Sequence, residues 1–357
     1  MSTVTSLDDH GGWPALLGLL LDRNHLTADQ AKAAMNTILS GDATPAQLIG
    51  FVVALRAKGE SAAELSGLLD SVLEHASIVP LTDDQRAATV DIVGTGGDHS
   101  HSINVSTMAA LVVAGAGIPV CKHGNRSASS KCGTADVLEL LGVAIELSAA
   151  GVAACVREAG IGFCYAPAFH PAFRFAGPPR RELGVPTAFN LLGPMANPGR
   201  VERQLIGVAD ARFAAPMAVA LERQGLTTAW VVHGEGMDEL TTTGPSHVTG
   251  LDHGVISEFT VDPATLGFAR AEADDLRGGA PEENALAVRR VLAGELGPHR
   301  DVVVLNAAAA LVVSGTVTDL AAGVERAKAS IDSGHAQASL DALIRVSQAH
   351  AAAEVDR

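Results

Sequence analysis

Short β-branched segments that alternate with helical patterns constrain the fold of this chain more than any other feature. From Ala88 onward these segments include TVDIVG at 89–94, IPVCKHG at 118–124, QLIGVAD at 204–210 and TAWVVHG at 228–234. They are apolar without regular alternation, which is typical of strands covered on both faces. The pattern therefore predicts an α/β fold with a mostly parallel central sheet. Beyond residue 280 we expect mainly helices.

Residues 13–76, in contrast, show only helical patterns. Thr27 begins a Thr-x-x-Gln capping box, Thr44 precedes a proline at a helix start, and Ser61 begins a Ser-x-x-Glu box. Three well-capped helices without an intervening strand signal predict a small all-helical domain that precedes the α/β domain.

The predicted domains are a helical domain at 1–85 and a larger α/β domain at 86–357 that includes the C-terminal helices. One segment, 167–203, interrupts the α/β alternation and is rich in Pro, Arg and Asn. We expect its part around 180–203 to pack back on the helical domain and complete it.

Composition excludes several classes of partner. The chain has 25 basic and 40 acidic residues, a net charge of −15, and only 3% aromatic residues. This charge argues against binding to a nucleic-acid backbone or an anionic membrane, and the few aromatic residues argue against a base-stacking platform. No apolar run approaches 18 residues, so no membrane span is expected.

The cysteines and the first residues indicate a reducing compartment. Four cysteines occur, at Cys121, Cys132, Cys155 and Cys164, and their spacing matches no zinc site. They are also too few for a disulfide scaffold in 357 residues. The N-terminal stretch carries acidic residues where a signal peptide would carry Lys or Arg. We therefore expect a cytoplasmic protein.

One window of this acidic chain contains no carboxylate. Residues 99–135 include no Asp or Glu, although the average acid content predicts about four, and they contain three basic residues and three histidines: Lys122, Arg126, Lys131, His99, His101 and His123. A chance cluster in buried elements would also give this pattern. The alternative, which the motifs inside the window favour, is a local anion-binding site.

Three motifs in this part of the chain have the composition of phosphate-binding loops. Gly94–Asp98 (GTGGD) follows a strand, and its glycines allow backbone N–H groups to approach phosphate oxygens. Asn104–Thr107 opens a helix, whose N-terminus binds anions but is also a usual place for caps. Lys122–Lys131 combines three cations with short polar side chains. None is a Walker loop or a dinucleotide fingerprint.

An acidic loop follows a later strand. The segment 233–239 (HGEGMDE) ends in the adjacent carboxylates Asp238 and Glu239. Such pairs are usually solvated surface, but this pair follows a strand of the predicted sheet, where α/β folds bind ligands. Across a crevice from a phosphate loop, the two carboxylates would be natural ligands for Mg²⁺ bound to a diphosphate.

Taken together, these motifs resemble the anthranilate phosphoribosyltransferases of tryptophan biosynthesis. The matching segments occur in the order of that family: GTGGD at 94–98, NVST at 104–107, KHGNRSASSKCGTADVLE at 122–139, PRRELGVPTAFNLLGPMANP at 179–198 and HGEGMDE at 233–239. The resemblance extends from the N-terminal helices to LNAAAALVVSG and IDSGHA near the C-terminus.

The resemblance implies a fold, a reaction and an assembly. It implies the architecture of the phosphoribosyltransferases related to pyrimidine nucleoside phosphorylases, with the active site between the two domains and a homodimer formed through the helical domain. The substrates would be 5-phosphoribosyl 1-diphosphate and anthranilate, and the products N-(5-phosphoribosyl)anthranilate and diphosphate. Two Mg²⁺ ions per active site would assist, and no nucleic acid or membrane partner is implied.

The resemblance also assigns residues. The donor, 5-phosphoribosyl 1-diphosphate, would be bound by Gly94, Gly97, Asp98, Ser102, Asn104, Val105, Ser106, Thr107, Lys122, His123, Gly124, Asn125, Arg126, Ser127, Ala128, Ser129, Ser130 and Thr134. The metals would be held by Ser106, Asp238 and Glu239. Anthranilate would contact Gly94, Asn125 and Arg180, with His123 as a further candidate and Pro179 and Arg181 as neighbours.

The implied chemistry needs no single catalytic acid or base. The aniline nitrogen is a usable nucleophile and a metal-bound diphosphate a good leaving group, so positioning and charge stabilisation would carry the reaction. One departure from the family pattern is KCGTAD at 131–136, where Cys132 replaces the usual Ser and Thr134 keeps a hydroxyl. The alternatives are a pyrimidine nucleoside phosphorylase-like enzyme and a nucleic-acid-binding, non-catalytic paralogue.

Overall fold

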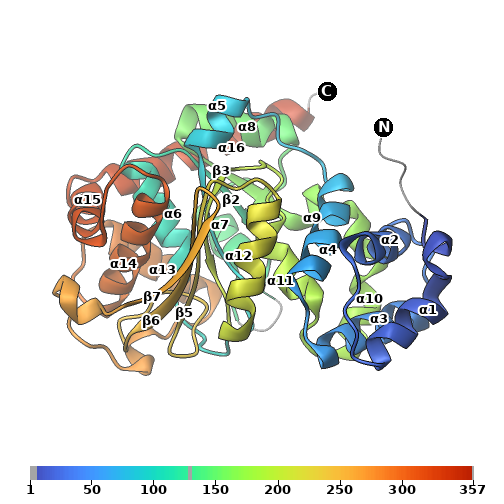
Figure 1. The fold of residues 1–357 in the computed structure, drawn as a ribbon. Helices are drawn as coiled ribbons and strands as arrows, with labels where there is room; N and C mark the ends of the chain where they lie inside the picture. Colours follow the sequence, from blue (N-terminus) through green and yellow to red (C-terminus); the bar gives the residue numbers. More distant parts are fainter. Residues whose placement is uncertain (1–5, 128–130, 356–357) are drawn as a thin grey trace.

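A computed structural model describes residues 6–127 and 131–355 of the chain (Figure 1). It contains a helical unit, a seven-stranded sheet with helices on both faces, and an inserted helical segment between them. The prediction of a small helical domain followed by a larger α/β domain with a mostly parallel sheet is confirmed. Within the described residues, no helix is long and apolar enough to cross a membrane.

Four main helices form the N-terminal unit: α1 (Gly12–Leu21), α2 (Ala28–Leu39), α3 (Pro45–Lys58) and α4 (Ala62–Glu74). The last three begin at the predicted caps. Thr27, Thr44 and Ser61 each accept a hydrogen bond from the backbone three residues later, and the side chain of that third residue bonds back. Each box satisfies two N–H groups that a helix start would otherwise leave unpaired.

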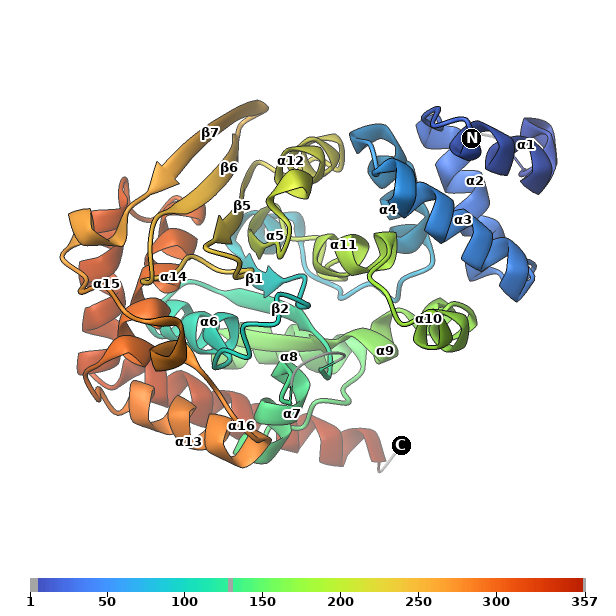
Figure 2. The same cartoon turned by 90° about the horizontal axis from the view of Figure 1, so that it is seen from below.

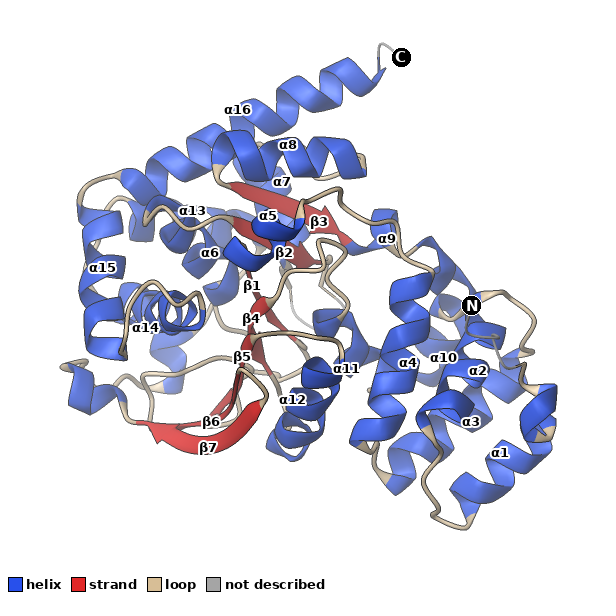
Figure 3. Ribbon diagram, turned by 45° about the horizontal axis from the view of Figure 1, so that its top comes forward, coloured by secondary structure: helices blue, strands red, loops and turns tan. Residues whose placement is uncertain are grey.

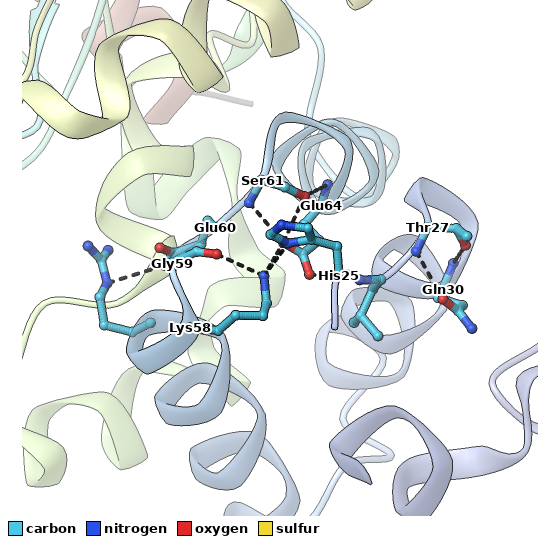
Figure 4. Close-up of polar contacts among 10 residues, drawn as sticks. His25, Thr27, Gln30, Lys58, Gly59, Glu60, Ser61 and Glu64 are labelled. Atoms are coloured by element: carbon cyan, nitrogen blue, oxygen red, sulfur yellow. Dashed lines mark hydrogen bonds and ion pairs between the residues drawn. The ribbon is translucent and has the colours of Figure 1, made fainter. Parts of the chain in front are cut away.

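A buried charged cluster joins α3 and α4 to the segment that leads into α2 (Figure 4). Glu64, at the start of α4, accepts hydrogen bonds from the Lys58 ammonium at 2.8 Å and from the backbone N–H of Leu26 at 2.8 Å. The side chains of Glu64 and Lys58 are 0% and 2% exposed. Because the carboxylate is fully bonded, its pKa falls below the usual value despite burial, which by itself raises it.

The sheet has the order β3-β2-β1-β4-β5-β6-β7. Its strands are β1 (Val90–Gly94), β2 (Val120–Gly124), β3 (Ile161–Tyr165), β4 (Arg203–Gly207), β5 (Thr228–Gly234), β6 (Ser246–Asp252) and β7 (Val255–Val261). The pairs from β3 to β5 are parallel, whereas β6 and β7 extend the sheet antiparallel. The strand order reverses between β1 and β4, which is the topological switch point of the sheet.

Helices cover both faces of the sheet (Figure 3). The helices that belong to the α/β part are α5 (Asp83–Ala88), α6 (Val105–Gly115), α7 (Thr134–Leu141), α8 (Ala149–Ala159), α12 (Ala214–Arg223), α13 (Pro281–Leu292), α14 (Pro298–Val313), α15 (Leu320–Asp332) and α16 (His335–Val355). The C-terminal helices α14 and α16 pack against α6. As a result, α14 is buried along nearly its whole length.

The inserted segment consists of α9 (Ala166–Phe169), a 3₁₀ turn over Pro171–Phe175, α10 (Gly177–Leu183) and α11 (Ala188–Met195). Figure 2 shows α11 between the sheet and the N-terminal helices and α10 beside those helices, and both contact α3. One core cluster unites buried side chains of the N-terminal helices with those of α11, α12 and one face of the sheet. The second core cluster lies on the other face, around α6, α14 and α16.

Candidate active site

The predicted binding loops meet at the carboxyl ends of the central strands. β1, β2, β4 and β5 all end in glycine, at Gly94, Gly124, Gly207 and Gly234. The GTGGD motif follows β1, the KHGNR motif spans the end of β2, and the acidic loop follows β5. This edge, beside the switch point between β1 and β4, is where open α/β sheets bind ligands.

Asp238 lies directly on the glycine loop. Its Oδ2 accepts a hydrogen bond from the backbone N–H of Gly96 at 2.6 Å. A Cβ on Gly94 would overlap the Asp238 carboxylate, and a Cβ on Gly207 would overlap the Asp238 backbone. Both strand ends therefore require glycine because the acidic loop approaches so closely.

Glu239 lies on the start of α6. Its Oε1 accepts a hydrogen bond from the N–H of Ser106 at 3.1 Å, and the residue is 8% exposed. The alternative of a solvated acidic surface is therefore wrong for Glu239. Predicted donor-binding and metal-binding residues that lie more than 130 positions apart in the sequence thus come into direct contact.

The surroundings of Asp238 and Glu239 disfavour the charged form of both carboxylates. Burial, together with the charge of Asp98, raises the pKa of Asp238 to about 7. Burial and the neighbouring Asp238 raise the pKa of Glu239 well above its ordinary value. Asp98 is close by, since its Oδ2 lies 3.5 Å from the Asp238 nitrogen. A cluster of buried hard-oxygen ligands with excess negative charge fits a divalent cation.

Protein side chains alone do not complete a metal cage. Within residues 6–127 and 131–355, no group of three or more His, Cys, Asp or Glu side chains has metal-binding geometry. Such a site suits Mg²⁺, which usually keeps one or two carboxylates and takes its other ligands from substrate phosphates and water. Ser106 Oγ, the third predicted ligand, accepts a hydrogen bond from Lys122 at 3.2 Å.

Lys122 places a positive charge next to the phosphate loops and the acidic loop. The residue is 2% exposed, and its ammonium also donates to the carbonyl of Ile92 on β1. Burial lowers the pKa of Lys122, and the carboxylates of Asp91 and Glu239 oppose that shift. The ammonium therefore offsets part of the negative charge of the acidic loop.

A second group of polar residues, Asp91 and Asn197, bonds to the backbone of β2. Asp91, fully buried in β1, accepts hydrogen bonds from the backbone N–H of His123 at 3.1 Å and from the Asn197 amide at 2.7 Å. Asn197 also donates to the carbonyl of Cys121 at 2.7 Å. Sequence reasoning did not single out Asp91 or Asn197. An isolated Asp in an otherwise apolar strand was the available signal.

Beyond β2, the donor loop is partly engaged with α7. Arg126 forms ion pairs of 2.9 Å with both Asp136 and Glu139, and these bonds raise its pKa. Asn125 is exposed, and its Oδ1 accepts a hydrogen bond from the Arg126 N–H at 2.7 Å. Ser127 donates its N–H to Asp136 at 3.2 Å. Ala128, Ser129 and Ser130 lie outside the described residues.

The side chain of Asn104 takes a different role from the helix cap that is usual at such a position. It makes no cap hydrogen bond at the start of α6. Its amide instead donates to the Cys132 carbonyl at 3.2 Å and accepts from Asn284 at 2.9 Å. Asn284, on α13, was missed by sequence reasoning because it lies 180 positions away. The result is that the first N–H groups of α6 are not used by Asn104.

Two threonine hydroxyls and the thiol of Cys132 lie close to Asn104 and the start of α6. Thr107 and Thr134 join α6 to α7 through hydroxyls 3.1 Å apart. The Cys132 thiol lies 3.6 Å from Asn104 Oδ1, and burial raises its pKa to about 11. Cys132 therefore remains a neutral thiol at physiological pH.

The other positions predicted to bind the donor are constrained by backbone conformation, backbone pairing or close packing. Gly97 has a φ of 78°, in the left-handed region that favours glycine. Ser102 pairs with Arg277 in an isolated bridge, and the N–H of Val105 donates to the Ile103 carbonyl at 2.7 Å. Gly124 approaches the Phe163 ring so closely that a Cβ would lie 3.0 Å from it.

Arg180 occupies the inserted segment on the other side of the site. Its guanidinium lies over the Phe189 ring, 4.6 Å from the centroid, and 3.5 Å from the Asn190 oxygen. Burial lowers its pKa to about 10, and among the described residues no carboxylate opposes this shift. Arg181, the neighbour, is exposed. A partly desolvated guanidinium of this kind is suited to a planar carboxylate ligand.

A row of contacting rings runs from Phe189, which Arg180 covers, to His123 in the donor-binding loop. His123 and His170 lie 5.0 Å apart, His170 stacks on Phe173 at 5.2 Å, and Phe173 meets Phe189 edge-on at 5.5 Å. Burial lowers the pKa of His170 to about 4 and that of His123 well below its ordinary value. Both rings are therefore neutral at pH 7.

Comparison with known proteins finds matches to both the helical and the α/β part of the chain. A family model described as the α/β domain of a glycosyl transferase family matches residues 86–337, and the corresponding helical bundle domain matches residues 14–76. An anthranilate phosphoribosyltransferase of Salinispora arenicola is 53% identical over 342 residues, covering 94% of this chain and 97% of that protein. That of a Nocardioides species is 55% identical over 335 residues, covering 92% and 97%.

Solved structures agree in fold as well. The anthranilate phosphoribosyltransferase of Thermus thermophilus superposes with a TM-score of 0.87 at 39% identity, covering 93% of this chain and 99% of that one. The Saccharomyces cerevisiae enzyme in complex with PRPP and Mg superposes with a TM-score of 0.85 at 28% identity, covering 94% and 98%. The resemblance predicted from the motifs is thereby confirmed. The chain belongs to the anthranilate phosphoribosyltransferase family.

Proposed function

We propose that this chain transfers the phosphoribosyl group of 5-phosphoribosyl 1-diphosphate to the amine of anthranilate, in tryptophan biosynthesis. The observation that carries the proposal is the contact of the acidic pair with both predicted phosphate loops. Asp238 lies on the Gly96 N–H and Glu239 on the Ser106 N–H. One cluster thus combines anion-binding N–H groups with metal-binding carboxylates, which is what a metal-bound diphosphate requires.

Mg²⁺ fits the donor set of this cluster. Asp238 and Glu239 would hold it, with Ser106 as a further oxygen ligand, and we propose two ions per active site. When bound, the ions would neutralise the diphosphate and make it a better leaving group. A relative from Saccharomyces cerevisiae has been solved in complex with PRPP and Mg, which supports this assignment.

The protein's own groups position the donor. The glycine loop offers N–H groups at Gly96 and Gly97, and the start of α6 offers those of Ser106 and Thr107, at the positive end of the helix dipole. Lys122 adds a buried positive charge beneath them. The N–H groups of Gly96 and Ser106 would become available to the diphosphate when Asp238 and Glu239 turn from them to the metal. Charge on the departing diphosphate would then meet N–H groups that the fold has already oriented.

A residue of the inserted segment would hold anthranilate, the acceptor. Arg180 would bind the anthranilate carboxylate, with its plane fixed by Phe189, and Gly94 and Asn125 would border the acceptor on the donor side. The amine would then face C1 of the ribose and displace the diphosphate with inversion. Because the nearby His123 and His170 rings are neutral and deeply buried, we assign no single catalytic acid or base.

One assay tests this function directly. Anthranilate fluorescence should disappear when phosphoribosyl diphosphate is added with Mg²⁺, and should persist when the metal is chelated. Thymidine with inorganic phosphate serves as the second arm, because turnover of that pair would indicate a nucleoside phosphorylase instead. Persistence of the fluorescence in the presence of donor and Mg²⁺ would refute the proposal.

The assembly and location are part of the same proposal. We propose a homodimer formed through the helical domain at 1–85, completed by the segment around 180–203. Support comes from large apolar side chains exposed on that domain, Leu21 at 75% and Val53 at 41%. Membership of a biosynthetic family, and four cysteines that are too few for a disulfide scaffold in 357 residues, support a cytoplasmic location.

A further inference from the structure

The side chain of Asn306 clamps the backbone directly after the acidic pair. Asn306 lies on α14 and is 0% exposed. Its Oδ1 accepts from the N–H of Leu240 at 3.0 Å, and its Nδ2 donates to the carbonyl of Leu240 at 2.7 Å. The second Nδ2 hydrogen goes to Val302, one turn earlier on α14, at 2.9 Å. The amide therefore uses its oxygen and both of its N–H groups.

An amide at this position is costly unless it has a specific partner. The neighbouring residues of α14 are apolar on both sides, VVVL at 302–305 and AAAALVV at 307–313. A buried amide in such surroundings costs free energy if its hydrogen bonds are unmet. Leu240 in turn is 0% exposed, so its backbone groups would be unpaired without Asn306. The two segments, 66 positions apart, satisfy each other.

The clamp acts on the acidic pair because the loop is also confined on its other side. Gly94 and Gly207 press against Asp238, and Gly234 lies against the Glu239 carbonyl. The next residue, Thr241, donates its N–H to Ser246 Oγ at 3.0 Å. The peptide unit that joins Glu239 to Leu240 therefore has a fixed orientation, and the Glu239 carboxylate is directed from that fixed point onto α6.

We propose that Asn306 is a positioning residue that orients Glu239, and with it Asp238, for binding metal-complexed diphosphate. The inference rests on the proposed function, because it assigns to Asn306 a role at the same site. Residues behind metal ligands commonly contribute 10–100-fold to metal affinity. Asn306 acts from behind the ligand through the backbone, and it does not contact the substrate itself.

The main readout of the test is binding, and turnover is used only to determine the KM for anthranilate. Inorganic diphosphate is titrated into the protein by calorimetry at a series of Mg²⁺ concentrations. Asn306→Leu keeps the number and branching of the side-chain heavy atoms but removes all three hydrogen bonds. We expect it to raise the Mg²⁺ concentration needed for half-maximal diphosphate binding about tenfold, and to leave the KM for anthranilate within about twofold of wild type.

Ser347→Ala is the matched control. Ser347 is also 0% exposed, and its hydroxyl accepts from the backbone N–H of Ala144 at 3.1 Å, but it bonds neither the acidic loop nor the phosphate loops. The control should lose stability without a change in Mg²⁺ dependence. If Asn306→Leu does not fold, Asn306→Ser, which is smaller and has a hydroxyl in place of the amide, carries the same measurement.

The outcomes separate this inference from the proposed function. A folded Asn306 variant with the Mg²⁺ dependence of wild type would overturn the positioning role and leave the transferase assignment intact. Failure of the wild-type protein to bind diphosphate with Mg²⁺ would instead refute the diphosphate site, and with it the proposed function.

Discussion

The guanidinium of Arg180 is supported by an aromatic ring, and no carboxylate takes part in its bonding within the described chain. Arg180→Ala should raise the KM for anthranilate about tenfold or more, because a charge-assisted hydrogen bond contributes roughly 1.5–3 kcal/mol. The KM for phosphoribosyl diphosphate should stay within about twofold. Steady-state kinetics with each substrate varied in turn gives both values.

The exposed neighbour provides the control for this prediction. Arg181→Ala removes the same charge one position along the chain and should leave both KM values near those of wild type. An equal rise in the two KM values for Arg180→Ala would remove Arg180 from the acceptor site.

His170 makes the stability of the protein dependent on pH. Burial lowers its pKa from 6.5 to about 4, and Arg200 contributes in the same direction. The unfolded chain therefore binds a proton more readily than the folded one. The stability contribution is present above pH 6.5 and is lost as pH falls towards 4.

Urea unfolding of wild type and of His170→Asn at pH 7 and pH 4.5 measures this effect. Between these two values, wild type should lose about 2 kcal/mol more of its unfolding free energy than the variant. His123 is also buried and is present in both proteins, so only the part of its pKa shift that His170 causes differs between them. Equal losses in the two proteins would show that His170 does not titrate as described.

At the scale of elements, the carboxylates of the acidic loop bond to backbone N–H groups that the diphosphate is proposed to use. Glu239 takes the Ser106 N–H at the start of α6. Diphosphate without metal would have to displace this carboxylate and approach its charge. Glu239→Gln should therefore bind metal-free inorganic diphosphate about tenfold more tightly than wild type, equivalent to ~1.4 kcal/mol.

With Mg²⁺ present the order should reverse, because the variant lacks one of the proposed metal ligands. Glu235→Gln is the matched control, since Glu235 is an exposed acid of the same loop and its substitution changes the net charge equally. Calorimetric titration with EDTA and with Mg²⁺ measures both cases. Weaker binding by Glu239→Gln in EDTA would contradict the competition between carboxylate and diphosphate.

The elements that sequence patterns predicted are those whose signals are local. The capping boxes at Thr27, Thr44 and Ser61 depend on residues three positions apart, and all three helices begin there. Strands β1, β2, β4 and β5 were predicted because apolar residues fill both of their faces. β7, in contrast, was not predicted: all but its last residue are exposed, so it shows no burial pattern.

The supporting residues of the site could not be predicted in the same way. The motifs identified Asp238, Glu239 and Lys122 through their chemistry and through resemblance. Asn197 and Asn306 act on backbone groups 76 and 66 positions away. An asparagine in a helix or loop has many alternative roles, and only the packed structure shows which distant peptide it bonds.

At the scale of the whole molecule, the helical unit is joined to the sheet by a common core. Buried residues of α1–α4, α11 and α12 and of one sheet face form one cluster. The charged pair of Arg56 and Glu60, 3.2 Å apart, continues this contact, since Arg56 lies 4.6 Å from the centroid of Phe213 beyond β4. The inserted segment that carries Arg180 is thereby held at a fixed position relative to the donor loops.

This arrangement predicts that the active site does not depend on the proposed dimer. The segment that carries Arg180 shares a buried core with β1 and β4, whereas Leu21 and Val53 are exposed on the helical unit. A double variant with Leu21→Glu and Val53→Glu should sediment as a monomer at micromolar concentration, because charges at the centre of an apolar interface oppose its burial. Its kcat should remain within a few-fold of wild type.

Leu296→Glu is the control for this last prediction. Leu296 is 81% exposed but lies between α13 and α14, in the α/β part of the chain, so its substitution should leave the dimer intact. Sedimentation velocity combined with the fluorescence assay gives assembly and activity for the same samples. A double variant that remains dimeric would place the interface elsewhere, and an inactive, folded monomer would show that the second subunit supports the site.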